Sequence, residues 1–179
     1  SKAEEWAQGF IFRAESGYTP GVVGLGVDVY GATGVKLYSD DDTAGTGLLP
    51  NAFGNEGPDS YGHASATAKA RVSKSVLRIG NLIPAIPIAQ ASDIRLLPQT
   101  YTGGALSIDE VENLNVQVGQ LREVNYRGST NREDLGATVG GTSDQFNYLG
   151  GTYEFTQSNT IVGLWRGELD DVYEQNLIN

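Results

Sequence analysis

Small or apolar residues alternate with polar residues along several short stretches of this chain, and turn residues separate the stretches. In residues 62–73, for example, Ala64, Ala66, Ala68 and Ala70 take alternate positions, and polar residues fill most of the positions between them. A period of two places the two sets on opposite faces of a β-strand. The repeated pattern predicts an all-β antiparallel sheet with one dry and one wet face, and the most demanding sheet of that kind is a transmembrane β-barrel.

The period predicts about seven or eight strands, separated alternately by short turns and long loops. The expected strands are residues 6–15, 22–31 with 35–37 as a continuation, 62–73, 76–83, 104–111, 114–123, 145–155 and 161–169. The expected long loops are residues 39–61, 84–103 and 124–144. This asymmetry is typical of bacterial barrels, whose long loops lie outside and whose short turns face the periplasm. The loop at 84–103 is unusually apolar, so we expect it to pack against another part of the protein.

Composition excludes several other classes of protein. The net charge of −10 argues against a nucleic-acid partner. The absence of cysteine excludes disulfides, thiolate metal sites and cysteine nucleophiles. No run of 18 apolar residues is present to form a membrane-spanning helix. The chain also lacks methionine, even at position 1, so we expect it to be a processed or truncated piece of a longer protein.

Seven short strings resemble the OprD family of outer-membrane carboxylate channels. They are residues 5–10 (EWAQGF), 15–21 (ESGYTPG), 23–28 (VGLGVD), 45–50 (GTGLLP), 69–74 (KARVSK), 95–100 (RLLPQT) and 167–173 (GELDDVY). The strings follow the order of the family and extend over nearly the whole chain, so together they are far more specific than any one of them.

The resemblance implies an 18-stranded, monomeric barrel in the outer membrane of a pseudomonad-like bacterium, with weak self-association left open. Residues 1–179 would form part of this single β-barrel domain, with the first strand and the C-terminal half missing. A partial sheet cannot close in lipid, so transport is expected only of the parent protein. The implied partners are outer-membrane lipid and small carboxylate solutes such as amino acids or aromatic acids. No cofactor and no metal are expected.

Five basic residues fall on the wet faces of the expected strands, opposite small or apolar residues. They are Arg13, Lys69, Arg71, Arg78 and Arg166. In a barrel those faces point into the lumen, and the planar donor fork of arginine matches a carboxylate. The resemblance implies that such residues form a basic path for the solute. The alternative is that they are ordinary solvent-facing charges, some of them paired with acids such as Glu15, Asp28 or Glu168.

The resemblance also implies that the loop at residues 95–100 folds into the barrel and narrows it. Such a loop needs apolar residues toward the wall and polar residues toward the path. The candidate constriction residues are Asp93, Arg95, Pro98 and Gln99. The alternative is a structural plug whose shape is fixed by its prolines.

Aromatic residues could form belts at the two membrane interfaces. The candidates are Trp6, Phe10, Phe12, Tyr18, Tyr30, Tyr148, Tyr153 and Trp165, and their alternative role is core packing in a soluble sandwich.

The leading interpretation is a substrate-selective porin, with no catalytic residues and no reaction catalysed. One alternative is a soluble β-sandwich that serves as a binding or adhesin-like module. A second is a β-rich glycosidase that uses Glu168 and Asp170. His63 is the only histidine and lacks a nucleophile motif, and Asp40–Asp42 lack the spacing of a calcium loop. We therefore expect neither to form a site.

Overall fold

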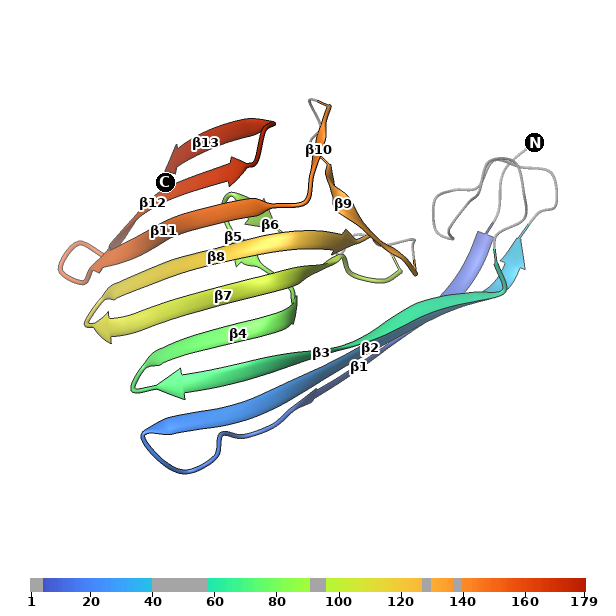
Figure 1. The fold of residues 1–179 in the computed structure, drawn as a ribbon, viewed down its shortest axis with the longest axis horizontal. Helices are drawn as coiled ribbons and strands as arrows, with labels where there is room; N and C mark the ends of the chain where they lie inside the picture. Colours follow the sequence, from blue (N-terminus) through green and yellow to red (C-terminus); the bar gives the residue numbers. More distant parts are fainter. Residues whose placement is uncertain (1–4, 40–57, 91–95, 127–129, 137–139) are drawn as a thin grey trace.

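The computed structural model describes residues 5–39, 58–90, 96–126, 130–136 and 140–179. These residues form β-strands, turns and extended segments (Figure 1). The strands are β1 (Glu5–Glu15), β2 (Val23–Ser39), β3 (Ser60–Val72), β4 (Ser75–Leu82), β5 (Ala85–Ile86), β6 (Ala89–Gln90), β7 (Thr100–Val111), β8 (Leu114–Asn125), β9 (Arg132–Gly136), β10 (Thr142–Ser143), β11 (Phe146–Phe155), β12 (Thr160–Leu169) and β13 (Tyr173–Ile178). Within the described ranges, no helix has the length and apolar character needed to span a bilayer.

One antiparallel sheet contains all the long strands. Its order is β1-β2-β3-β4-β7-β8-β11-β12-β13, so each of these strands pairs with the next one along the path. Strand β9 pairs with β8 and β10, while β5 and β6 form a separate two-stranded hairpin. The sheet is a meander, in which neighbouring strands are joined by hairpin connections, and this is the topology of an up-and-down barrel wall.

The predicted all-β antiparallel fold is confirmed, and each of the eight predicted strands corresponds to a strand of the sheet. The structure also contains β13, which the sequence analysis did not predict, because polar and apolar residues occur on both of its faces. The short strands β5, β6, β9 and β10 lie inside two of the expected long loops. Strands of two residues are too short to produce a periodic signal. The predicted continuation of the second strand through residues 35–37 is confirmed, since β2 extends without a break to Ser39.

The register of the strands separates the residues into two faces. Leu25 pairs with Ala70, Ala70 with Leu77, Leu77 with Leu106, Leu106 with Val118, and Val118 with Leu149. Cross-strand partners share a face, so this apolar row extends across six strands. We call this side the outer face and the opposite side the inner face.

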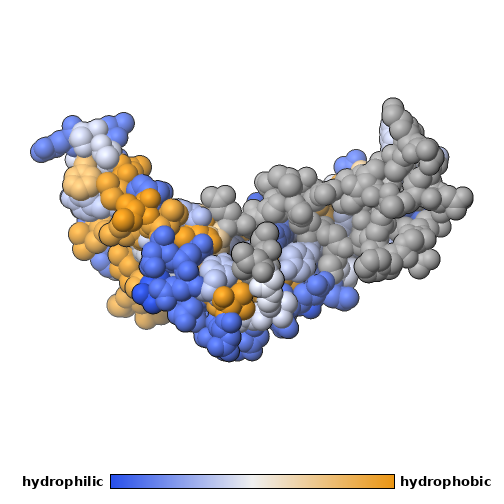
Figure 2. Space-filling view, turned by 90° about the horizontal axis from the view of Figure 1, so that it is seen from above, coloured by the Kyte–Doolittle hydropathy of each residue, from blue (hydrophilic) through white to orange (hydrophobic). Residues whose placement is uncertain are grey.

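Large apolar side chains are exposed along the outer face. Leu25, Leu77, Leu149 and Leu164 are each 40–58% exposed. Figure 2 shows hydrophobic residues gathered at the end of the crescent where Figure 1 places the short turns. Exposed apolar surface on this scale needs an apolar partner, and bilayer lipid provides one along a sheet.

The inner face is lined by polar, small and aromatic residues. Two of the aromatic rings lie across a glycine of the neighbouring strand. A Cβ atom at Gly119 would lie 2.5 Å from the Tyr148 ring, and one at Gly150 would overlap the Trp165 ring. Glycine therefore allows the ring to lie flat against the wall. In the described part of the chain no second large sheet packs on either face, unlike a β-sandwich.

The connections β1–β2, β3–β4, β7–β8 and β11–β12 lie at one end of the sheet, and the long connections lie at the other end together with the short turn between β12 and β13 (Figure 1). The tight turns contain Ser73, Asn113 and Asn159, whose φ angles of 54°, 63° and 49° are in the left-handed region. Asparagine tolerates this region better than most residues, and two-residue hairpin turns require it. The long connections follow β2, β4 and β8. From the asymmetry of bacterial barrels we expect the short-turn end to face the periplasm.

A charge on the outer face should destabilise the barrel, whereas the same charge on the inner face should not. In a closed barrel that contains these strands, Leu77→Arg is expected to lower the free energy of unfolding by about 2–4 kcal/mol, because the arginine must enter lipid. The matched control is Gln117→Arg on the inner face, with an expected change of less than about 1 kcal/mol. Urea unfolding in lipid vesicles measures both. Equal losses in the two variants would contradict the assignment of the faces.

Candidate functional site

Three rows of inner-face residues cross the first strands and form a polar wall. In the first row Arg13 pairs with Tyr30, which pairs with Ser65. In the next row Glu15 pairs with Asp28, which pairs with Thr67. In the third row Lys69 pairs with Arg78. The alternation detected in the sequence therefore collects basic, acidic and hydroxyl groups on one face.

The segment between β4 and β7 lies against this inner face. Ile86 is 3% exposed and packs in a cluster with Leu82 and Tyr148. Further along, the Gln175 Nε2 atom of β13 donates a hydrogen bond to the Ile88 carbonyl oxygen at 3.0 Å. The first part of the segment therefore reaches the C-terminal strands of the sheet.

The last part of the same segment packs at the other side of the wall. Leu97 is 1% exposed and belongs to a cluster with Tyr30, Ala32 and Tyr61 of β2 and β3. The Leu96 side chain lies so close to Gly9 of β1 that a Cβ atom there would be only 3.0 Å from it. The described parts of the segment thus contact strands near both edges of the sheet. The prediction that residues 84–103 pack against another part of the protein is confirmed for the described parts.

A pocket of about 340 Å³ lies between the wall and the start of this segment. Its polar lining includes Arg13, Glu15, Asp28, Thr67, Arg78, Asn81 and Gln117. Its other lining residues include Pro84, Ala85, Ile86, Tyr30 and Tyr148. The pocket contains two arginines with exposed side chains, so it offers donor forks to a carboxylate.

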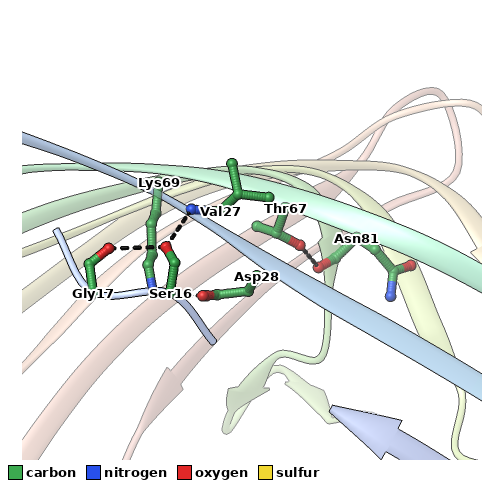
Figure 3. A network of polar contacts seen from close by, with 7 residues as sticks. All are labelled: Ser16, Gly17, Val27, Asp28, Thr67, Lys69 and Asn81. Atoms are coloured by element: carbon green, nitrogen blue, oxygen red, sulfur yellow. Dashed lines mark hydrogen bonds and ion pairs between the residues drawn. The ribbon is translucent and has the colours of Figure 1, made fainter. Parts of the chain in front are cut away.

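Two of the predicted basic residues lie at this pocket, and two others lie nearby in different surroundings. Arg13 and Arg78 line it, and the Arg13 Cζ atom is 5.7 Å from the centre of the Tyr30 ring. Lys69 is on the same face, but its ammonium group is buried and forms an ion pair with Asp28 (Figure 3). Arg71 lies one row closer to the short turns and is exposed.

The expected position of Arg166 on the inner face is wrong. Arg166 pairs with Leu149 of β11 and Asn176 of β13, which places it in the outer-face row that begins at Leu25. Its Nη2 atom forms an ion pair with Glu174 at 2.9 Å. The physical reason lies in Trp165, the preceding residue of β12. Here Trp165 is 5% exposed on the inner face, so its neighbour Arg166 points outward.

The other predicted aromatic residues divide in the same way. Phe10, Phe12 and Tyr153 are exposed on the outer face, as a membrane belt requires. Tyr30 and Tyr148 are buried on the inner face, so their assignment to the belts is wrong.

Pro98 and Gln99 are the predicted constriction residues that the structure describes. Pro98 is buried and Gln99 is half-buried at the end of the segment between β4 and β7. Asp93 and Arg95 lie outside the described residues, as do Asp40–Asp42. His63 lies on β3 with its ring centre 5.4 Å from that of Tyr30.

The sequence analysis missed the contribution of tyrosine and neutral polar residues to the pocket. Tyr30, Tyr148, Thr67 and Asn81 all border it, and the Thr67 hydroxyl donates a hydrogen bond to the Asn81 carbonyl (Figure 3). For Tyr148, the available signal was an inward-facing glycine on a neighbouring strand. That pairing cannot be read without knowledge of the register.

Comparison with known proteins identifies the family. The model of the outer membrane porin family OprD matches residues 1–179. The chain belongs to the OprD family. OprD-family proteins are porins of the Gram-negative outer membrane, and porins are channels rather than enzymes, so the glycosidase alternative is set aside.

Individual relatives of this OprD-family chain match it almost from end to end. It is 43% identical to the porin-like protein GalP of Pseudomonas putida over 97% of this chain and 43% of GalP. It superimposes on OpdK of Pseudomonas aeruginosa, solved with vanillate, with a TM-score of 0.91 and 44% identity over 98% of this chain and 46% of OpdK. For OccK2 of the same species, solved with glucuronate, the TM-score is 0.82 with 38% identity over 97% and 43% of the two chains. The chain therefore spans less than half the length of these relatives.

The ion pair between Lys69 and Asp28 should stabilise the inner wall. The side chains of Lys69 and Asp28 are 6% and 23% exposed, so removing one charge leaves the other buried without its partner. Asp28→Asn is expected to lower the free energy of unfolding of the closed barrel by roughly 2–4 kcal/mol. The control is Glu123→Gln, because Glu123 and Arg132 are 45% and 52% exposed in their ion pair at 3.8 Å, so the pair should contribute less than about 0.5 kcal/mol. Urea unfolding compares them, and similar small losses in both variants would show that Lys69 is well hydrated.

Proposed function

We propose that these strands form part of the wall of a closed barrel through which small carboxylate solutes diffuse across the outer membrane. The observation that carries the proposal is the pocket on the inner face, where Arg13 and Arg78 line a space of about 340 Å³. A volume of this size suits a small organic acid. Charge-assisted hydrogen bonds from arginine would replace part of the hydration of the solute.

The segment between β4 and β7, which we call the inward segment, gives the proposed channel its selectivity by narrowing the path of the solute. Its apolar side chains, including Ile86 and Leu97, pack on the wall and hold the segment in place. Pro84, Ala85 and Ile86 line the pocket. A solute that passes this point exchanges part of its water for charge-assisted hydrogen bonds to the arginines.

The relatives support the carboxylate class. OpdK and OccK2 were solved with vanillate and with glucuronate, and both ligands are carboxylates. The individual solute that this chain selects would depend on which side chains line the rest of the closed lumen.

The acids of the wall set a limit on how strongly the proposed path holds an anion. Glu15 and Asp28 border the same pocket as the two arginines, and Asp28 is already engaged by Lys69. A path lined by both acidic and basic side chains binds an anion weakly. Weak binding suits a channel, because a solute that binds tightly leaves slowly.

The basic path can be tested with two solutes of nearly equal size, acetate and acetamide. In vesicles that contain the closed barrel, Arg13→Gln and Arg78→Gln should each lower the ratio of acetate to acetamide permeation by about three- to ten-fold. The control is Arg166→Gln, which removes the same charge from the outer face and should leave the ratio unchanged. Vesicle swelling or isotope uptake measures the ratio. An unchanged ratio in both inner-face variants would refute the basic path, as would an equal decrease in the Arg166 variant.

A further inference from the structure

The connection between β1 and β2 folds over the inner face of the wall instead of extending away from it. Gly24 and Gly26 of β2 face inward beneath this connection. A Cβ atom at Gly26 would lie 2.6 Å from the Gly17 carbonyl oxygen, and one at Gly24 would lie 2.9 Å from the Tyr18 Cβ atom. The two glycines therefore provide the space in which the connection lies against the wall.

Hydrogen bonds hold the connection in this position. The Val27 N–H group donates to the Ser16 Oγ atom at 2.7 Å, and the Leu25 N–H group donates to the Thr19 Oγ1 atom at 2.9 Å (Figure 3 draws the first of these). Backbone bonds between the same pairs of residues, at 3.1 and 2.8 Å, complete the two bridges. These bonds fix the position of the backbone of Tyr18, which lies between them.

Tyr18 projects from this connection toward two cations of β3. The centre of its ring is 5.0 Å from the Lys69 Nζ atom and 4.5 Å from the Arg71 Cζ atom. Both distances are within the range of a cation–π interaction. The motif ESGYTPG thus places an aromatic ring on the inner face at the short-turn end of the barrel.

The two cations beneath the ring differ in their availability to a solute. The Lys69 ammonium is buried, and Asp28 neutralises it. Arg71 is exposed, and in the described part of the chain no ion pair involves it. A cation–π contact does not use the N–H groups of arginine as hydrogen-bond donors to an acceptor oxygen, so they stay available to another partner. Arg71 therefore remains able to bind a carboxylate in a bidentate manner.

We propose that Tyr18 is a positioning residue that presents Arg71 as a carboxylate-binding station at the periplasmic end of the lumen. This proposal rests on the proposed function, since it adds a further station to the same basic path. Tyr18 restricts the long Arg71 side chain to an orientation across the lumen, so less conformational entropy is lost when an anion binds. Lys69 has a structural role in the same cluster and does not contact the solute.

Block of single-channel current by benzoate tests the station in a planar bilayer. Benzoate is added to the short-turn side of the closed barrel, and the half-blocking concentration is measured. Tyr18→Leu should raise this concentration by about two- to five-fold, whereas Tyr18→Phe, which keeps the ring face, should leave it near the original value. Arg71→Gln should raise it at least as much as Tyr18→Leu. When benzoate is added from the long-loop side, the same variants should change the half-blocking concentration less.

The double variant Tyr18→Leu/Arg71→Gln separates positioning from an independent contact. If Tyr18 acts through Arg71, the double variant should match Arg71→Gln alone. Additive effects would overturn the proposal, as would an unchanged half-blocking concentration in Tyr18→Leu that retains heat-modifiable migration. If Tyr18→Leu does not fold, Arg71→Lys serves instead, because it keeps the charge but lacks the planar fork. It should weaken block from the short-turn side, and block equal to the original would overturn the station.

Failure of the Arg71 station can be distinguished from failure of the whole basic path by the permeation ratios. Loss of the station alone leaves the permeation ratios of the Arg13 and Arg78 variants lowered. Failure of the whole basic path leaves those ratios unchanged as well.

Discussion

Backbone hydrogen bonding is the constraint on which the rest of this structure depends. A strand in lipid has no water to satisfy its N–H and C=O groups, so each strand must be paired on both sides. The meander from β1 to β13 meets this requirement for every strand inside the sheet. Once the hydrogen bonds between neighbouring strands fix the register, they also fix which side chains face lipid and which face the lumen. The apolar outer row and the polar inner rows are consequences of this pairing.

Connections between strands, rather than a second sheet, cover part of the inner face. The segment after β4 lies against the wall, and its apolar side chains pack between aromatic rings that rest on glycines. The connection after β1 lies over Gly24 and Gly26 in the same manner. In both places a glycine on the wall provides room for chain that enters the lumen. These close approaches account for part of the glycine content of 24 in 179 residues.

The period of two in the sequence was sufficient to predict the main strands and, for most of them, the faces. It placed Arg13, Arg71 and Arg78 on the inner side because each lies between small or apolar neighbours. It failed at Arg166, because Trp165 is buried on the inner face and its neighbour Arg166 therefore lies on the outer face. Alternation identifies two faces, but by itself it does not identify which face meets lipid when both carry bulky residues.

The environment of each charge could not be predicted from the sequence. Lys69 and Arg71 are two residues apart on one face and look equivalent as sequence positions. In the structure, Asp28 from the neighbouring strand neutralises Lys69, while Arg71 is exposed beneath Tyr18. Asp28 and Lys69 are 41 residues apart, and Tyr18 is 53 residues from Arg71, so only the register of three strands brings them together. The inward path of the segment after β4 likewise depends on contacts with strands at both ends of the sheet.

Cysteine accessibility tests the central claim, the division into a lipid face and a lumen face, most directly. The chain contains no cysteine, so each introduced thiol is unique to its position within this segment. In a closed barrel reconstituted in lipid, a charged, water-soluble thiol reagent should modify Arg78→Cys and Gln117→Cys and reduce the current. It should leave Leu77→Cys and Val118→Cys unmodified until detergent is added. Equal modification at all four positions in intact vesicles would contradict the account.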